Sequence, residues 1–231
     1  MTTRVTIPLN VDDFIQEAYC SLRTNLQFCG LGSNLKTIAV TSCNPSEGKT
    51  TVSLNLAVSI TSLDKRVLLV DADLRKPRNL KGIEHNYNYG LSNYLSHMAD
   101  FEEVVCNTNV KFLHMTLCGP KPPKPAELLA TGRFDEFISE AKKNYDVVIF
   151  DTPPLGSVID AAIIAPKTDG TIFVIESNTV DYKMAQRVKE QLHRSNSKVI
   201  GAVLNKLDKK NYKDYHSSYS YYNKVNDEKI S

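Results

Sequence analysis

The segment Pro45–Thr51 reads Pro-Ser-Glu-Gly-Lys-Thr-Thr, and it constrains the fold more than any other part of the chain. It follows the apolar run Thr37–Thr41 and precedes a segment of helix length, Thr50–Ser62. A strand, a loop and a helix in this order aim backbone N–H groups and the positive end of the helix at one point in space. The sequence therefore predicts a phosphate-binding loop.

The side chains at the start of the expected helix support this prediction. Lys49 is suited to neutralise charge on β- and γ-phosphates, and Thr50 can offer its hydroxyl to Mg²⁺, as in P-loop proteins. The match to G-x-x-x-x-G-K-[ST] is incomplete, because Cys43 stands at the first glycine position. The alternative interpretation is a strand-to-helix turn with an exposed lysine.

Apolar runs rich in β-branched residues alternate with helix-length segments along the chain. The runs are Thr37–Thr41, Arg66–Val70, Phe112–Leu117, Asp146–Phe150, Thr171–Ile175 and Lys198–Leu204. The helix-length segments include Thr50–Ser62, Gly132–Lys143 and Asp181–Ser195. This alternation predicts an α/β fold of the P-loop NTPase type, with a mostly parallel sheet and helices on both faces.

Acidic residues follow two of the expected strands. Asp71 and Asp73 come after the run Val67–Val70, where strand alternation would turn both carboxylates to one side, and Asp151 ends the run before Thr152. Ligands of open parallel sheets gather at the carboxyl ends of strands, so these acids are candidate Mg²⁺ ligands or proton acceptors. The alternative is that Asp71 and Asp73 are solvated turn residues or pair with Arg75.

We expect one domain, residues 1–206, followed by a tail, residues 207–231. Within the domain, 11–28 is predicted to be an amphipathic leading helix with Phe14, Ala18, Leu22 and Leu26 on one face. The tail has few aliphatic residues, which predicts a flexible segment. It holds five of the eleven tyrosines, namely Tyr212, Tyr215, Tyr219, Tyr221 and Tyr222. We interpret them as accessible phenols, the alternatives being an adhesive disordered tail or a platform for stacking nucleic-acid bases.

Composition argues against several classes of protein. A net charge of +2 without a long basic block gives no reason to expect a nucleic-acid partner. Five cysteines without a C-x-x-C pair favour reduced thiols over disulfides or zinc. No apolar run approaches the roughly 20 residues that cross a bilayer, so we expect a soluble, cytoplasmic protein.

The phosphate loop and the acidic segments around Asp71, Asp73 and Asp151 together resemble those of the bacterial tyrosine kinases, which are P-loop enzymes. The resemblance rests on Val67–Val70 leading into Asp71-x-Asp73-x-Arg75, on Asp151-Thr152-Pro153-Pro154, on Glu17–Arg23, on Gly119–Leu129 and on the tyrosine cluster. It covers nearly the whole chain and is greatest for the kinases of capsule or exopolysaccharide synthesis that are made as separate cytosolic chains.

The resemblance implies the role of each site residue. The family's Walker A residues, which bind ATP, correspond to Ser46, Glu47, Gly48, Lys49, Thr50 and Thr51. Asp71 would be the base for the tyrosine hydroxyl, and Asp73 and Asp151 would support Mg²⁺. Ser46 stands where the family often has glycine. Asn205 follows the last strand, where related ATPases contact adenine, although it could equally cap the strand.

The resemblance also implies partners. The family's E-x-x-R-x-x-R contact motif retains Glu17 and Arg23, while Cys20 replaces its first arginine. We therefore expect homo-oligomers that associate through Glu17 and Arg23, with phosphorylation between subunits. Separate-chain kinases of this family work with a membrane activator of the polysaccharide co-polymerase type, which would recruit the chain to the membrane.

Two other functions share the same motifs. A ParA- or MinD-like positioning ATPase would have a signature lysine five residues before Lys49, but Asn44 stands there. A nucleotide-bound regulatory subunit without transfer activity would use the same phosphate loop, so the sequence leaves it open.

Overall fold

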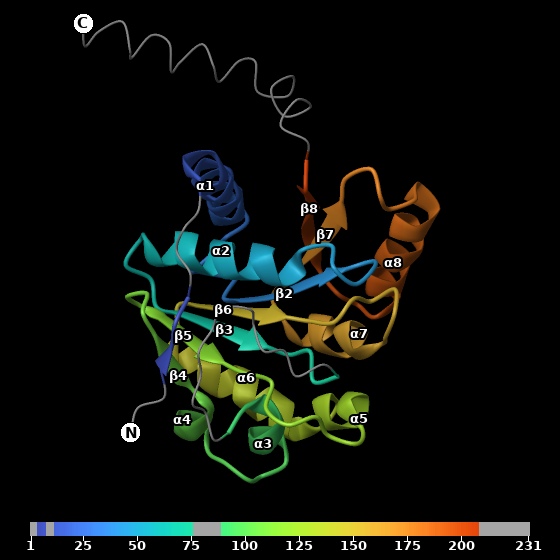
Figure 1. Ribbon diagram of the computed structural model, residues 1–231. Helices are drawn as coiled ribbons and strands as arrows, with labels where there is room; N and C mark the ends of the chain where they lie inside the picture. Colours follow the sequence, from blue (N-terminus) through green and yellow to red (C-terminus); the bar gives the residue numbers. More distant parts are fainter. Residues whose placement is uncertain (1–3, 8–11, 76–88, 208–231) are drawn as a thin grey trace, which may run out of the picture.

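A computed structural model describes residues 4–7, 12–75 and 89–207, which form a β-sheet covered by helices on both faces (Figure 1). The strands are β1 (Arg4–Val5), β2 (Thr37–Ser42), β3 (Val67–Asp71), β4 (Cys106–Thr108), β5 (Leu113–Thr116), β6 (Val147–Asp151), β7 (Gly170–Glu176) and β8 (Val199–Asn205). The helices are α1 (Asp13–Phe28), α2 (Lys49–Thr61), α3 (Leu91–Leu95), α4 (Phe101–Val104), α5 (Pro125–Leu129), α6 (Gly132–Asn144), α7 (Asp160–Ile164), the 3-10 helix η1 (Ala165–Lys167) and α8 (Tyr182–Arg194).

The sheet has the strand order β1-β4-β5-β3-β6-β2-β7-β8. Neighbouring strands are parallel except for the antiparallel pair β4 and β5. All six predicted strands are present, which confirms the mostly parallel α/β prediction. The two strands that the sequence did not reveal, β1 and β4, are two and three residues long, too short for an alternating or apolar run to stand out.

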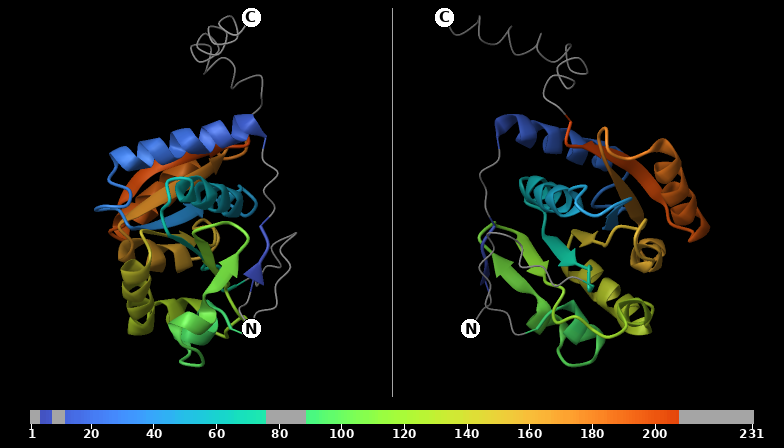
Figure 2. Two further views of the ribbon diagram at one scale, coloured as in Figure 1. Left: turned by 90° about the vertical axis from the view of Figure 1, so that its left-hand side faces the viewer. Right: turned by 45° about the vertical axis from the view of Figure 1, so that its right-hand side comes forward.

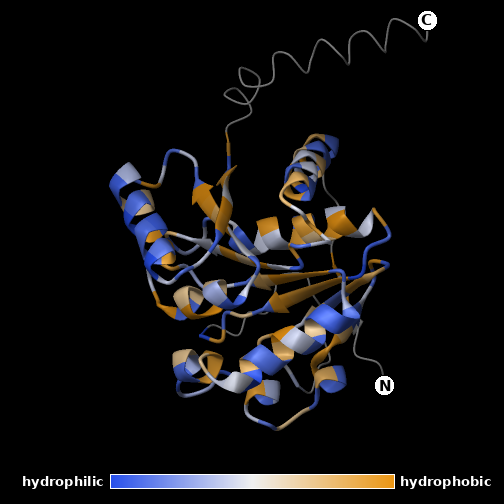
Figure 3. Cartoon of the chain, turned by 180° about the vertical axis from the view of Figure 1, so that it is seen from behind, coloured by the Kyte–Doolittle hydropathy of each residue, from blue (hydrophilic) through white to orange (hydrophobic). Residues whose placement is uncertain are grey.

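Side-chain alternation along the strands builds one apolar cluster on each face of the sheet. Ile38 and Val40 of β2 join the cluster under α2, whereas Ala39 joins the cluster under α6 and α7. The strands are apolar along most of their length because both faces are covered, as the hydropathy colouring in Figure 3 shows.

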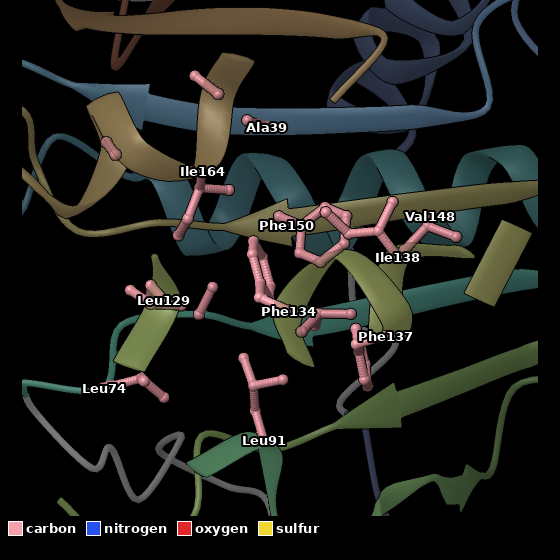
Figure 4. Close-up of a cluster of buried hydrophobic side chains, with 14 of the residues drawn as sticks. Ala39, Leu74, Leu91, Leu129, Phe134, Phe137, Ile138, Val148, Phe150 and Ile164 are labelled. Atoms are coloured by element: carbon pink, nitrogen blue, oxygen red, sulfur yellow. The ribbon is translucent and has the colours of Figure 1, made fainter. Parts of the chain in front are cut away.

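Helix α6 shows how a helical sequence pattern closes one face. Its buried residues Phe134, Phe137, Ile138 and Ala141 recur at helical spacing. The rings of Phe134 and Phe137 lie 5.7 and 6.4 Å from that of Phe150 on β6, in edge-on arrangements (Figure 4). Burying each such ring stabilises the fold by roughly 1.5–3 kcal/mol, so α6 is firmly attached to the strand that ends in Asp151.

The predicted leading helix is present as α1, which packs across α2 on the same side of the sheet (Figure 2). Its N-cap residue Asp12 accepts a hydrogen bond from the Phe14 N–H, at 3.1 Å. The predicted apolar face is buried only at its C-terminal end, where Leu26 is 5% exposed, whereas Phe14 is 42% exposed. No helix in the described ranges is long and apolar enough to cross a membrane.

Candidate active site

The phosphate loop joins β2 to α2 at the carboxyl edge of the sheet. Two of its residues, Ser46 at φ 66° and Gly48 at φ 92°, have left-handed backbone conformations. Gly48 has a second reason to be glycine, because a Cβ atom there would lie 2.0 Å from Nδ2 of Asn205. Ser46 has no such freedom, and its conformation costs about 1–2 kcal/mol.

Glu47 turns its side chain into the loop and is only 1% exposed. Its carboxylate accepts hydrogen bonds from the backbone N–H groups of Asn44 and Cys43, at 2.8 and 3.3 Å. Burial, reinforced by the Glu47 charge, raises the pKa of the Cys43 thiol to about 11, so this thiol stays protonated at neutral pH. The side chain of Glu47 therefore shapes the loop from within, and nucleotide binding by Glu47 as a Walker A residue remains a prediction.

The carboxyl end of β8 contacts the same loop. The amide of Asn205 donates to the Glu47 carbonyl at 2.8 Å, and Nζ of Lys206 donates to the Ser46 carbonyl at 2.8 Å. Lys206 also pairs with Glu176, the last residue of β7, at 3.0 Å. Asn205 thus lies beside the loop, and its contact with a base remains a prediction.

The first turn of α2 carries Lys49, Thr50 and Thr51. Lys49 is 2% exposed, Thr50 is half-buried and Thr51 is exposed. The Thr50 hydroxyl donates to a carboxylate oxygen of Asp151, at 2.5 Å. This hydrogen bond connects the start of the P-loop helix to the end of β6.

The predicted acids gather at the ends of two neighbouring strands. Asp71 and Asp151 are register partners on β3 and β6, each 5% exposed. Asp73 is 3% exposed, and its N–H donates to the Asp71 carboxylate at 3.1 Å. Within the described residues, no group of three or more His, Cys, Asp or Glu side chains could hold a metal ion without other ligands.

A cavity of about 20 Å³ lies between these elements. It is lined by Thr50, Asp71, Asp151, Leu54, Leu69 and Met115. This volume holds roughly one water molecule or one small ion. Asp73 is not among the lining residues, so Thr50, Asp71 and Asp151 supply the oxygen atoms around the cavity.

Sequence reasoning left the partner of Arg75 open, and it missed Asp160. Asp160, at the start of α7, is fully buried and receives two hydrogen bonds from the Arg75 guanidinium, at 2.8 and 2.7 Å. These bonds raise the pKa of Arg75, which keeps its charge. The pair joins the loop after β3 to the segment after β6, 85 residues later. No local pattern marks such a contact.

Gly156 was also missed. A Cβ atom at this position would lie 2.3 Å from the carbonyl oxygen of Cys43. The segment after Asp151 can therefore pass against the start of the phosphate loop only because residue 156 has no side chain.

Comparison with known proteins decides the family. A family model described as an AAA domain matches residues 35–199. Tyrosine-protein kinase YwqD of Bacillus subtilis is 40% identical over 208 residues, which cover 89% of this chain and 85% of the relative. Tyrosine-protein kinase CpsD of Streptococcus agalactiae is 38% identical, over 87% of this chain and 88% of the relative. The chain belongs to the bacterial tyrosine-protein kinases. It is accordingly an enzyme of the P-loop type, with a nucleotide-binding fold.

Solved structures agree with this assignment. The kinase domain of the Escherichia coli tyrosine kinase ETK superimposes with a TM-score of 0.81 at 32% identity, over 88% of this kinase and 82% of that chain. The chimerical protein CapA2B2 gives 0.78 at 31% identity, over 84% and 85%. MinD of Pyrococcus horikoshii gives 0.63 at 23% identity, over 78% and 76%, and this likeness concerns the fold alone.

The predicted oligomer residues of the kinase lie on α1, away from the phosphate loop. Glu17 is exposed. The guanidinium of Arg23 donates to the Ser59 carbonyl at 2.5 Å and to its hydroxyl at 3.3 Å, so it fixes α1 to the last turn of α2 within the same chain. Tyr212, Tyr215, Tyr219, Tyr221 and Tyr222 lie outside the described residues, as does most of the predicted tail.

Proposed function

We propose that this kinase transfers the γ-phosphoryl group of ATP, with Mg²⁺, to tyrosines of the C-terminal cluster on a neighbouring copy of itself. The observation that carries the proposal is the small cavity shared by Thr50, Asp71 and Asp151 at the start of the P-loop helix. Phosphoryl transfer depends on positioning and on charge stabilisation around the phosphates, and hydroxyl and carboxylate oxygens beside the P-loop helix are suited to hold the Mg²⁺ that would stabilise this charge.

In this proposal the phosphate loop holds the nucleotide. The N–H groups of Ser46, Glu47 and Gly48 and of the first α2 turn bind β- and γ-phosphate oxygens, as P-loops do. Lys49 neutralises their charge, and the Thr51 hydroxyl is exposed beside them. Asn205, next to the loop, is proposed to contact the base.

The oxygen atoms at the cavity fit Mg²⁺. This ion takes oxygen ligands and is commonly held by one or two carboxylates together with substrate phosphates, so a cluster of three acidic side chains is not required. Thr50 and Asp151, already hydrogen-bonded to each other, are the proposed protein ligands, with Asp73 supporting them from the loop after β3. When bound, the ion neutralises charge on the phosphate oxygens.

We assign the proton transfer to Asp71. Its carboxylate accepts the proton of the incoming phenol while the phenolic oxygen forms a bond to the γ-phosphorus. The bond between that phosphorus and the β,γ-bridging oxygen breaks, and ADP leaves with the bonding electrons. Support for this assignment comes from the position of Asp71, whose side chain lines the cavity together with Thr50 and Asp151.

The acceptors in this proposal are Tyr212, Tyr215, Tyr219, Tyr221 and Tyr222. Copies would associate through α1, using the exposed Glu17 together with Arg23, and each would receive the tail of another. An unchanged sedimentation profile after Arg23→Glu would contradict this mode of association, even though Arg23 also contacts Ser59 within its own chain.

The proposal extends to capsule or exopolysaccharide synthesis, which this kinase would regulate from the cytoplasm. A membrane activator of the polysaccharide co-polymerase type would recruit it to the membrane. The likeness to a chimerical CapA2B2 protein and to relatives named CpsD and CapB supports this assignment.

Mixing two variants tests transfer between subunits. One variant replaces all five tail tyrosines with phenylalanine and keeps the site, and the other carries Lys49→Met and keeps the tyrosines. Each is incubated with ATP and Mg²⁺, alone and then mixed, with and without the activator's cytosolic segment. Phosphotyrosine is measured with an antibody.

We expect phosphotyrosine only in the mixture, and only on the Lys49→Met chain. Phosphotyrosine on neither chain, with ATP bound and the activator present, would contradict the proposal. That result would favour a positioning ATPase or a regulatory subunit instead.

A further inference from the structure

The last two residues before the predicted tail are fixed to the phosphate loop. Asn205 donates to the Glu47 carbonyl and Lys206 to the Ser46 carbonyl, each at 2.8 Å. We call Asn205 and Lys206 the β8 clamp. It joins residues about 160 positions apart in the sequence.

The clamp acts on the peptide groups that a nucleotide would meet. In a trans peptide the N–H points away from the C=O of the same unit, and the described residues contain no cis peptide bond. A bond to the Ser46 carbonyl therefore also sets the direction of the Glu47 N–H. A bond to the Glu47 carbonyl does the same for the Gly48 N–H. The clamp holds the carbonyls on one side and turns these two N–H groups to the other.

Ser46 makes this restraint necessary. At φ 66° it adopts a conformation that non-glycine residues avoid, so the loop has a reason to relax when the restraint is lost. Lys206 is itself left-handed, at φ 57°, which shows that the backbone bends at the point where its side chain crosses to Ser46. The hydrogen bond from Lys206 to Ser46 therefore joins two residues that both have unfavourable left-handed backbone conformations.

Glu176 positions the Lys206 ammonium from the other side. Its carboxylate lies 3.0 Å from Nζ, and the side chains of Lys206 and Glu176 are 47% and 20% exposed. An ion pair this exposed contributes little to global stability. Removal of the Lys206 side chain should therefore affect the conformation of the phosphate loop more than the stability of the fold.

We propose that Lys206 is a positioning residue for the nucleotide: it holds the Ser46 peptide so that the loop N–H groups face the β- and γ-phosphates of a nucleoside di- or triphosphate. This inference rests on the proposed function for the identity of the ligand. Lys206 acts through the loop, so its contribution should appear for ligands with a β-phosphate and not for a nucleoside monophosphate.

Isothermal titration calorimetry of the full-length chain with ADP and with AMP, in Mg²⁺ buffer, tests this role. The variants are Lys206→Ala, Lys206→Arg and a matched control, Lys198→Ala, which removes an exposed lysine just before β8. We expect Lys206→Ala to weaken ADP binding about three- to tenfold, as loss of one partly exposed charged hydrogen bond would. AMP affinity should change less than twofold.

The conservative variant and the control separate positioning from a general structural effect. Lys206→Arg keeps a donor at the Ser46 carbonyl and should restore at least half of the lost ADP binding energy, and Lys198→Ala should match the native chain. The unfolding midpoint of ligand-free Lys206→Ala should stay within about 2 °C of native, because the ion pair is exposed.

Unchanged ADP affinity in Lys206→Ala, or an equal loss for AMP and ADP, would overturn the positioning role while leaving the proposed function intact. A native chain that binds neither ADP nor ATP would overturn the proposed function, and the positioning role with it.

Discussion

The hydroxyl of Thr50 donates a hydrogen bond to the carboxylate of Asp151, with 2.5 Å between the two oxygen atoms. Thr50 lies in the first turn of α2, the helix after β2, and Asp151 is the last residue of β6, the strand next to β2. The contact therefore brings together two motifs that are 101 residues apart. It places a hydroxyl and a carboxylate oxygen side by side, the pair of ligand types that P-loop proteins offer to Mg²⁺.

Replacing either member of this pair should impair the use of Mg²⁺. We predict that Thr50→Val and Asp151→Asn each lower the phosphorylation rate by at least about 10²-fold at a fixed Mg²⁺ concentration, because phosphoryl transfer depends mainly on positioning and on stabilising the charge of the phosphate oxygens. Thr50→Val should also shift the Mg²⁺ dependence to higher concentration. The measurement is initial rate against Mg²⁺ concentration.

Asp64→Asn serves as the control for Asp151→Asn, because it makes the same change of charge at an exposed turn. A variant at Thr50 or Asp151 with native rates and native Mg²⁺ dependence would rule out the proposed ligands.

Asp71→Asn should remove the proton acceptor without removing nucleotide binding. We predict a fall in kcat of about 10²- to 10⁴-fold, the usual contribution of a general base. ADP affinity should remain within about twofold of native, because the proposed phosphate contacts come from the loop and Lys49. Single-turnover experiments measure the rate of phosphoryl transfer, and titrations with ADP measure the affinity. Equal losses in kcat and in ADP affinity would instead identify Asp71 as a binding residue.

Phosphorylation of the tail should weaken self-association. Residues 207–231 carry five lysines and four acids, a net charge of +1, and each phosphate adds roughly −1.5 to −2. Five phosphates would add a charge of about −8 to −10 to the tail. The acids Asp71, Asp73 and Asp151 of a neighbouring site would then repel the tail. Sedimentation velocity of both forms at low and moderate salt measures the effect. Identical oligomer distributions in both salts would be incompatible with this prediction.

Asp169 should make the stability of the fold depend on pH. Burial alone would raise the pKa of Asp169, but hydrogen bonds from Lys142, Thr37 and Lys36 outweigh burial and lower it. A carboxylate with a lowered folded-state pKa stabilises the fold above its unfolded-state pKa of about 3.9, and this contribution is lost as pH falls through the folded value. We predict that Asp169→Asn lowers the free energy of unfolding by about 1–3 kcal/mol at pH 7.

The loss of unfolding free energy caused by Asp169→Asn should become smaller as the pH falls below about 4, where the native carboxylate also becomes protonated. Urea unfolding at several pH values measures this, with Asp64→Asn again as the charge-matched control. A deficit that is the same at pH 7 and pH 3 would contradict the assignment.

The sequence predicted the central strands and the phosphate loop because their signals are local. Parallel strands buried on both faces are continuous apolar runs, and the Gly48-Lys49-Thr50 segment follows one of them after a short loop. The contact between Arg75 and Asp160 could not be predicted from the sequence, because it depends on how the segments after two strands come together in space. The inward turn of Glu47 was missed for a similar reason, since a charged side chain in a loop is usually solvated.

The role of Arg23 was predicted from a motif alone. The motif marks the residue, but it does not reveal that the guanidinium reaches Ser59 of the same chain. Only the packing of α1 against α2 determines that contact.

Site-resolved phosphotyrosine mass spectrometry shows directly whether the kinase phosphorylates its own tail. The native chain and Lys49→Met are incubated with ATP and Mg²⁺, each with and without the activator's cytosolic segment. We predict phosphate on tyrosines between Tyr212 and Tyr222 in the native chain and none in Lys49→Met. Absence of phosphotyrosine from the native chain, with ATP bound and the activator present, would contradict it.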